Sequence, residues 1–144
     1  MEGEKFKFFE HTADTIFEAY GKTYEKAFAN AALAMQEVMT NTAKVAPKQE
    51  EKISAKGQDM KALLYDFLEK FLILKDAKNL VFSEIKVEKI TEGVGECRLT
   101  AVARGERFDS KKHTDRTVVK AVTYHEMEIG EKDKKKYVRV LVDI

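Results

Sequence analysis

The chain has 144 residues, and its 26 Lys and Arg side chains nearly balance its 25 Asp and Glu side chains, giving a formal net charge of +1. This balance argues against a protein that holds nucleic acid mainly by neutralising phosphates, and against an acidic tail or linker. The length and a hydrophobic content of 44% fit one globular domain spanning residues 1–144, because a chain of this size buries enough surface to fold without disulfides or structural metals.

The first part of the chain alternates in hydrophobicity and then becomes helical. Apolar and polar residues alternate over residues 5–8 and again over residues 16–20, which predicts two strands joined by a short connection at residues 11–14. Thr23 is a candidate N-cap, and apolar residues recur with helical spacing from there to about Met39. We therefore expect two strands followed by a helix.

The middle of the chain contains the strongest helical pattern. Residues 41–47 are expected to form a loop, since Pro47 fits neither neighbouring element. A short strand around residues 53–57 ends at a glycine, and Asp59 can then cap a second helix. The apolar stripe of this helix contains Met60, Leu63, Leu64, Phe67, Leu68, Phe71 and Leu72. Such a stripe indicates a helix that packs on a sheet.

The rest of the chain has the pattern of antiparallel strands. Alternation over residues 84–104 around a glycine-rich turn at 93–95 predicts a hairpin. A loop over residues 105–116 precedes a strand from about 118 to 129, and a charged turn over residues 130–136 leads to a final strand over residues 138–144. The order of elements predicts a single α+β domain, with a mainly antiparallel β-sheet and two amphipathic helices packed on it.

Cysteine usage and hydropathy bear on the compartment. Cys97 is the only cysteine, so no internal disulfide can form, and its place on the apolar side of a predicted strand indicates a small core residue. No run approaches the ~18 apolar residues of a membrane-spanning helix, and residues 1–5 are too charged for a signal peptide. We therefore expect a cytoplasmic protein that makes no contact with a membrane.

Charge is unevenly distributed despite the neutral total. Residues 1–18 carry five acidic side chains against two lysines, whereas residues 104–120 carry six basic side chains against three acidic ones. Either segment could dock a partner, but a solvated terminus and a solvated loop explain the pattern more simply.

Residues 11–14, with the sequence His-Thr-Ala-Asp, are the first candidate for chemistry. They present polar groups in a tight connection between two predicted strands, as functional loops on rigid scaffolds often do. The simpler interpretation is an Asx-type turn, in which Asp14 only accepts hydrogen bonds from backbone N–H groups.

The C-terminus is the second candidate. In the predicted last strand, Val142 and Ile144 point to one face and Asp143 to the other, and the chain stops while still in the strand. The terminal carboxylate therefore lies beside Asp143, and two such negative groups need Lys or Arg, or a divalent cation such as Ca²⁺ or Mg²⁺, to offset their repulsion. Three carboxylates would converge if Asp14 lay nearby, which residue spacing alone does not decide.

Several segments of the chain match segments of one known protein family, in the same order along the sequence. They are residues 10–14, 27–32, 63–68, 105–106 followed by His113, 119–125 and 142–144. Each match is modest, but together they are specific, and the sequence resembles archease, the small cytoplasmic protein that activates the RtcB-type tRNA-splicing RNA ligase. The resemblance covers the whole chain.

The resemblance implies an α+β fold and a function as a non-catalytic protein cofactor of the ligase. Such proteins promote guanylylation of the ligase's active-site histidine, enable multiple turnover and broaden the use of nucleoside triphosphates. It also implies a divalent metal ion, with Ca²⁺ as the ion expected, bound by Asp14, Asp143 and the terminal carboxylate of Ile144. It does not establish whether RNA is contacted directly.

Lys120 and His11 are candidates for ligase activation. In the predicted strand, Lys120 shares a face with Val122 and Tyr124, and its ammonium group could contact the ligase or a nucleoside triphosphate that the ligase holds. The simpler interpretation is a surface lysine whose stem covers apolar neighbours. His11 could donate a hydrogen bond near the site, whereas His125, on the apolar face of the strand, is expected to be a core residue.

Three classes of function remain open. The leading class is the ligase activator, and the second is a general chaperone or modulator of RNA-modifying enzymes, for which exposed apolar surface would matter more than carboxylates. The third is a small hydrolase that uses Asp14 and Asp143 as a metal-binding carboxylate pair. The sequence favours the first class, because the polar features cluster at strand ends and no pair of nucleophile and base is visible.

Overall fold

The computed structural model of the chain describes residues 3–10 and 14–144. Its elements, in order, are β1 (Phe6–Glu10), β2 (Asp14–Gly21), α1 (Tyr24–Met39), a 3₁₀ turn (Thr42–Lys44), β3 (Gln49–Gly57), α2 (Met60–Lys78), β4 (Leu80–Gly93), β5 (Glu96–Arg107), β6 (Ala121–Lys132) and β7 (Lys135–Asp143). This order confirms the predicted α+β fold with two helices and antiparallel strands.

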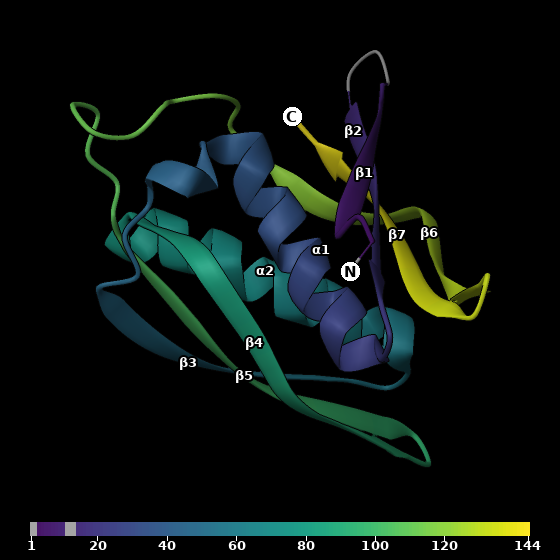
Figure 1. The fold of residues 1–144 in the computed structure, drawn as a ribbon. Coiled ribbons are helices and arrows are strands. Elements are labelled where there is room, and N and C mark those ends of the chain that lie inside the picture. Colours follow the sequence, from purple (N-terminus) through teal and green to yellow (C-terminus); the bar gives the residue numbers. More distant parts are fainter. Residues whose placement is uncertain (1–2, 11–13) are drawn as a thin grey trace.

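The strands form two antiparallel sheets, with the helices between them. One sheet has the order β1-β2-β7-β6 and the other the order β3-β5-β4. Helix α1 packs on β2 and β4, and α2 packs on β3 and β6, so each helix contacts both sheets (Figure 1). In the four-stranded sheet, β2 and β7 come from opposite ends of the chain and lie side by side at its centre.

Both helices begin at the residues that the sequence indicates. The Thr23 side chain accepts a hydrogen bond from the backbone N–H of Lys26, and Asp59 accepts one from the N–H of Ala62. These bonds satisfy N–H groups that have no partner within the helix. Helix α2 ends at Lys78 and is capped by Asn79, whose left-handed backbone (φ 55°) suits a helix C-terminus.

One hydrophobic core connects the two sheets and the helices between them. Its largest fully buried side chains include Phe17 of β2, Phe28 of α1, Phe67 and Phe71 of α2, and Phe82 of β4. Cys97 is buried in the same core as a free thiol, as predicted. Within the described ranges, neither helix is long and apolar enough to cross a membrane.

The sequence-based prediction is wrong in detail for the last hairpin. β6 extends to Lys132 and β7 starts at Lys135, so the turn is only the pair Asp133 and Lys134. Both residues have positive φ angles, of 51° and 65°, the conformation that a tight two-residue hairpin requires. The expected charged turn over residues 130–136 is therefore largely strand. β6 also begins at Ala121, later than residue 118.

His125 is not a core residue, contrary to the prediction. The pairing of β6 with β7 shifts between Thr123 and Glu128, where β6 bulges out, and Glu126 there has a positive φ of 56°. This bulge breaks the alternation of faces on which the prediction relied. The His125 side chain is consequently 74% exposed, with its Nε2 3.8 Å from a carboxylate oxygen of Glu126.

Candidate functional site: a pair of carboxylates at the end of two central strands

The ladder between β2 and β7 places Asp14 directly opposite Asp143. Opposed residues of an antiparallel pair have their side chains on the same face, about 5 Å apart at Cβ. Three residues further along β2, Phe17 opposes Val140, and both are fully buried in the core on the helix side. Asp14 and Asp143 therefore lie on the other, outer face of the sheet, where both are partly exposed.

The last residue of the chain follows the predicted alternation. Val142 is fully buried, and Ile144 packs against the same core. Asp143 thus points to the outer face, and the terminal carboxylate follows one residue beyond it. We call Asp14, Asp143 and this terminal carboxylate the acidic corner.

The start of β6 borders the acidic corner. Ala121 opposes Asp143 on the side of β7 away from β2, and the backbone N–H of Lys120 donates a hydrogen bond of 2.8 Å to the Asp143 carbonyl oxygen. The Lys120 side chain is exposed. The structure therefore brings Asp14, Asp143 and the backbone of Lys120 together from three distant parts of the sequence. His11, the other candidate, lies outside the described residues.

A second charged group occupies the same outer face further along the ladder, and sequence reasoning missed it. Glu18, only 6% exposed, opposes Arg139, whose Nη1 lies 3.0 Å from a Glu18 carboxylate oxygen. The Tyr20 hydroxyl donates to Glu18 at 3.0 Å, and the Lys132 ammonium lies 3.6 Å away. The opposite charges at positions 18 and 139 are visible in the sequence, but they become a signal only once the strand pairing is known.

The pKa values of this group reflect its burial and its partners. Burial alone would raise the pKa of Glu18, but hydrogen bonds from Tyr20 and Arg139 outweigh it and hold the pKa below its usual value. Burial, together with the hydrogen bond to Glu18, raises the pKa of Tyr20 to about 12. At neutral pH, Glu18 is therefore ionised and forms ion pairs with its basic neighbours.

An apolar pair separates the two charged groups. Ile16 opposes Leu141 between them, and both are buried, at 3% and 2% exposure. Arg139 lies four residues from Asp143 along β7, roughly 13 Å at the usual rise of a strand. Because Arg139 already binds Glu18, it is not the group that offsets the charge of the acidic corner.

The donors of the acidic corner suit a hard divalent cation. Ca²⁺ and Mg²⁺ prefer carboxylate oxygens, and two like charges directly opposite each other on a sheet are otherwise unfavourable. Within residues 3–10 and 14–144, no group of three or more His, Cys, Asp or Glu side chains is arranged to hold a metal ion. The two Asp side chains alone are therefore not such a group, and a metal site here would also require the terminal carboxylate or a group outside these residues.

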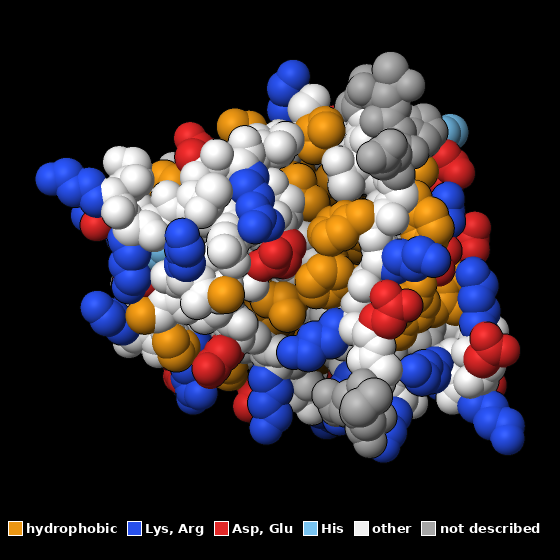
Figure 2. Space-filling view, turned by 45° about the horizontal axis from the view of Figure 1, so that its top comes forward, with side chains coloured by type: hydrophobic (Ala, Val, Ile, Leu, Met, Phe, Trp, Pro, Cys, Tyr) orange, Lys and Arg blue, Asp and Glu red, His pale blue; other side chains and the backbone are white. Residues whose placement is uncertain are grey.

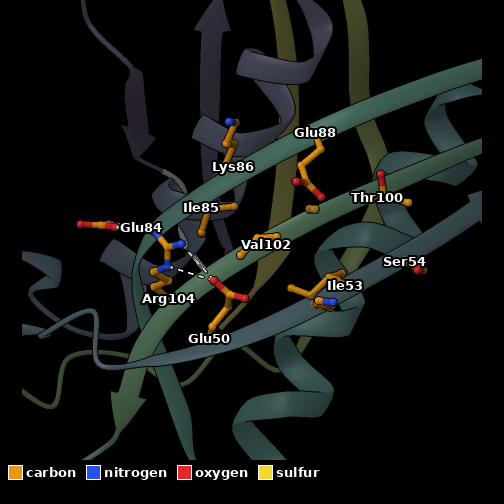
Figure 3. A pocket seen from close by; sticks show the side chains of 12 residues that line it. Glu50, Ile53, Ser54, Glu84, Ile85, Lys86, Glu88, Thr100, Val102 and Arg104 are labelled. Atoms are coloured by element: carbon orange, nitrogen blue, oxygen red, sulfur yellow. Dashed lines mark hydrogen bonds and ion pairs between the residues drawn. The ribbon is translucent and has the colours of Figure 1, made fainter.

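A surface hollow on the other sheet has a different character. It has a volume of about 760 Å³ and lies on the outer face of β3, β5 and β4 (Figure 3). At its edge the Arg104 guanidinium lies 3.0 Å from Glu50 and 3.8 Å from Glu84. Arg104 pairs with both carboxylates, and the hollow does not adjoin the acidic corner, which lies on the four-stranded sheet.

Comparisons with known proteins agree with this architecture. The archease protein family model matches residues 6–144. The archease of Sulfurisphaera tokodaii is 44% identical, covering 98% of this chain and 99% of that protein, and the archease of Methanosarcina barkeri is 41% identical, covering 99% and 98%.

Two solved structures are similar as well. The solution structure of a Methanobacterium thermoautotrophicum protein superposes with a TM-score of 0.84 at 43% identity, covering 97% of this chain and 99% of that one. The crystal structure of a Thermotoga maritima archease, described as a possible chaperone, gives a TM-score of 0.58 at 20% identity and covers 96% of each chain. The second likeness extends to the fold alone.

Proposed function

The chain belongs to the archease family, and on that basis we propose that it activates an RtcB-type tRNA-splicing RNA ligase. In this role it promotes guanylylation of the ligase's active-site histidine in the cytoplasm, enables multiple turnover and broadens nucleotide use in tRNA ligation. The chain itself performs no catalysis. The observation that supports this proposal most directly is the pairing of Asp14 with Asp143 beside Lys120.

The acidic corner would hold a divalent metal ion, with Ca²⁺ as the ion proposed. Asp14, Asp143 and the terminal carboxylate of Ile144 would be its ligands from this chain. When bound, the ion would supply positive charge that offsets the carboxylates and a Lewis-acidic contact for oxygen atoms of a partner. The strands hold the two Asp backbones in register, so the chain contributes a prearranged pair of donors.

Lys120 would contact the ligase or a nucleoside triphosphate held by the ligase. Its side chain is exposed, while its backbone is tied to the carbonyl of Asp143. An ammonium group at this place offers a point charge to phosphate oxygens as negative charge develops on them. His11, three residues before Asp14 in the sequence, remains a candidate for contacts in the same process.

A guanylylation assay with the cognate ligase tests the proposal. The purified ligase is incubated with GTP and varied divalent metal, and its covalent guanylylation is followed with and without this protein at substoichiometric amounts. We expect one molecule of this protein to activate many ligase molecules, and we expect the Asp14→Ala variant, folded as judged by circular dichroism, to lose that effect. Absence of stimulation at every ratio and metal concentration would overturn the proposal.

A second candidate function is that of a general chaperone or modulator of RNA-modifying enzymes. Exposed apolar surface favours it: Phe8 is 43% exposed and Ile73 51% exposed, and Figure 2 shows hydrophobic side chains at the surface between charged ones. Serine at these two positions should then reduce suppression of client aggregation, measured by light scattering. Asp14→Ala should leave that suppression intact.

A further inference from the structure

The segment 108–120, which we call the strap, joins the two sheets. It leaves the three-stranded sheet after Arg107 at the end of β5 and enters the four-stranded sheet at Ala121, and it contains no helix or strand. Figure 1 shows it as the long green loop that passes over one end of α1. Connections longer than about 12 residues without secondary structure are uncommon and are usually functional or disordered. The contacts of the strap show that this one is ordered.

The first fixed point of the strap is His113, whose side chain is fully buried. The backbone N–H of Asp109 donates a hydrogen bond of 2.8 Å to its Nδ1, and its Nε2 lies 2.9 Å from a carboxylate oxygen of Glu106. Because Nδ1 accepts, the ring carries its proton on Nε2 and donates it to Glu106. One imidazole therefore closes the turn of the strap and attaches that turn to β5.

Glu106 is itself held from several sides. Its carboxylate accepts hydrogen bonds of 2.7 Å from the Lys112 ammonium and from the backbone N–H of Ala46. These bonds, with that from His113, lower the pKa of Glu106 to about 2, so the carboxylate remains ionised. The pair of Glu106 and His113 thus connects the strap, the end of β5 and the loop before β3.

The second fixed point is the C-terminal end of α1. The last carbonyl groups of a helix have no partner within it, and the strap supplies two: the N–H of Arg116 donates to Met39 and that of Thr117 to Val38, both at 3.1 Å. The Thr40 hydroxyl donates in return to the carbonyl of Thr114 at 2.7 Å. These bonds give the strap a defined path across the helix end.

Arg116 adds a charge to the backbone bonds at the same place. Its Nη1 donates to the carbonyl of Glu37 at 2.9 Å and lies 3.0 Å from the Glu37 carboxylate. The last turn of α1 has no basic residue of its own, and a positive charge is favourable at the negative end of the helix dipole. The positive charge of Arg116 therefore stabilises the C-terminal end of α1, and the same contacts hold the strap in place against the helix.

The strap ends at the acidic corner. Val119 is buried at 7% exposure within the core, and the next residue, Lys120, donates its backbone N–H to the carbonyl of Asp143. The exposed Lys120 side chain is thus carried by the last residue of a segment that is fixed at each end. A functional side chain on a loop gains precision when its supporting residues are themselves held by hydrogen bonds and packing.

We propose that Glu106 and His113 are positioning residues, which fix the strap so that Lys120 is presented beside Asp143 to an anionic group of the partner. They act at a distance, through the strap and the end of α1, and touch neither partner nor metal. The role of Lys120 in this inference rests on the proposed ligase activation. The placement of Lys120 against Asp143 is independent of the proposed ligase activation. It can be measured in the isolated protein.

Two substitutions separate the two hydrogen bonds of His113. His113→Asn retains an acceptor for the Asp109 N–H but does not reach Glu106, whereas His113→Gln can still donate to Glu106 but lacks the acceptor. Thr40→Val removes the bond to Thr114 with little change of volume, which provides a variant should both His113 variants fail to fold. Lys111→Ala, an exposed lysine on the strap, is the matched control.

Amide hydrogen exchange over residues 114–120 is the first measurement. We expect the His113 variants and Thr40→Val to speed exchange there by about tenfold or more, including at the Lys120 amide, while Lys111→Ala leaves it unchanged. Unchanged exchange in folded His113 or Thr40 variants would overturn the inference, whatever the ligase assay shows. A wild-type protein that fails to stimulate the ligase would instead overturn the proposed function.

A double-mutant cycle with Lys120→Ala is the second measurement. If His113 acts through Lys120, the double variant His113→Gln, Lys120→Ala should stimulate guanylylation as weakly as Lys120→Ala alone. If the two substitutions instead reduced stimulation by independent factors that multiply in the double variant, His113 would act independently of Lys120. The positioning role would then be wrong. General loss of stability would not produce such non-additivity, because it would lower the activity of both backgrounds equally.

Discussion

Asp14 and Asp143 face each other as the terminal pair of the ladder between β2 and β7. Their side chains lie on the outer face of the sheet, away from the core that Phe17 and Val140 form on the other face. Strands from the two ends of the chain thus combine to place two carboxylates together. If these carboxylates bind the proposed cation, metal binding and folding stability become interdependent, because a ligand that binds only the folded state stabilises it.

Asp143→Asn should separate metal binding from folding. The substitution keeps the shape of the side chain and the backbone carbonyl that accepts from Lys120, but it removes one charge. We expect the free energy of unfolding without metal to stay the same or rise, by about 0.2–1 kcal/mol, because one like-charge contact is lost. Stabilisation by added Ca²⁺, measured as a shift in Tm, should fall sharply.

The same variant should fail to stimulate ligase guanylylation. Serine at Val94, a fully exposed tip residue of the β4–β5 hairpin, is a suitable control that alters neither property. An Asp143→Asn protein that retains both the Ca²⁺-dependent rise in Tm and full stimulation would show that neither property requires the negative charge of Asp143.

Terminal tags test the contribution of the last carboxylate. A short C-terminal extension keeps Asp143 and Ile144 but moves the terminal charge away, whereas the same extension at the N-terminus leaves it in place. We expect the C-terminal extension to weaken both Ca²⁺ binding, measured by calorimetry, and ligase stimulation. Equal behaviour of the two proteins would argue that the acidic corner needs no terminal carboxylate.

The acidic corner also shows which structural features can be predicted from the sequence alone. Alternation within the last strand correctly assigns Asp143 and Val142 to opposite faces, because the side-chain period of a strand is local information. The N-caps Thr23 and Asp59 are correct for the same reason. The register that sets Asp14 opposite Asp143 joins residues from the two ends of the chain, and no local pattern specifies it.

Two further features show where local reasoning ends. The bulge of β6 at Glu126 requires a left-handed backbone at a residue that has no turn signature, so the predicted burial of His125 is wrong. The contact between Glu106 and His113 depends on a turn within an irregular segment. Family motifs contain both residues, but neither hydropathy nor spacing indicates that they are partners.

Lys120→Ala should lower ligase stimulation without lowering stability. The side chain is exposed, and only the backbone N–H bonds to Asp143, so the substitution leaves that bond intact. We expect a fall in the guanylylation rate of about tenfold or more, typical of losing a charged contact to phosphate, and an unchanged Tm. Lys120→Arg should restore part of the rate. An unchanged rate for Lys120→Ala would remove Lys120 from the mechanism.

The lowered pKa of Glu106 predicts that its contribution to the free energy of unfolding is lost at acidic pH. Hydrogen bonds from Lys112, Ala46 and His113 lower its pKa to about 2, from an ordinary value of 4.5. A carboxyl group with a lowered pKa in the folded state stabilises that state fully above its ordinary pKa. This stabilisation diminishes as pH falls from about 4.5 toward 2, because the unfolded chain then binds the proton more readily.

Comparison with Glu106→Gln isolates this effect. The wild-type protein should be more stable than the variant at pH 6, and the difference in urea midpoint should shrink steadily between pH 5 and pH 3. Glu50→Gln, at an exposed salt bridge with Arg104, is a control for general acid destabilisation and should show a much weaker trend, since surface ion pairs contribute little. A constant difference between wild type and Glu106→Gln across this range would mean that the Glu106 carboxylate is not preferentially ionised in the folded protein. The hydrogen bonds from Lys112 and His113 would then have to be weaker than their geometry indicates.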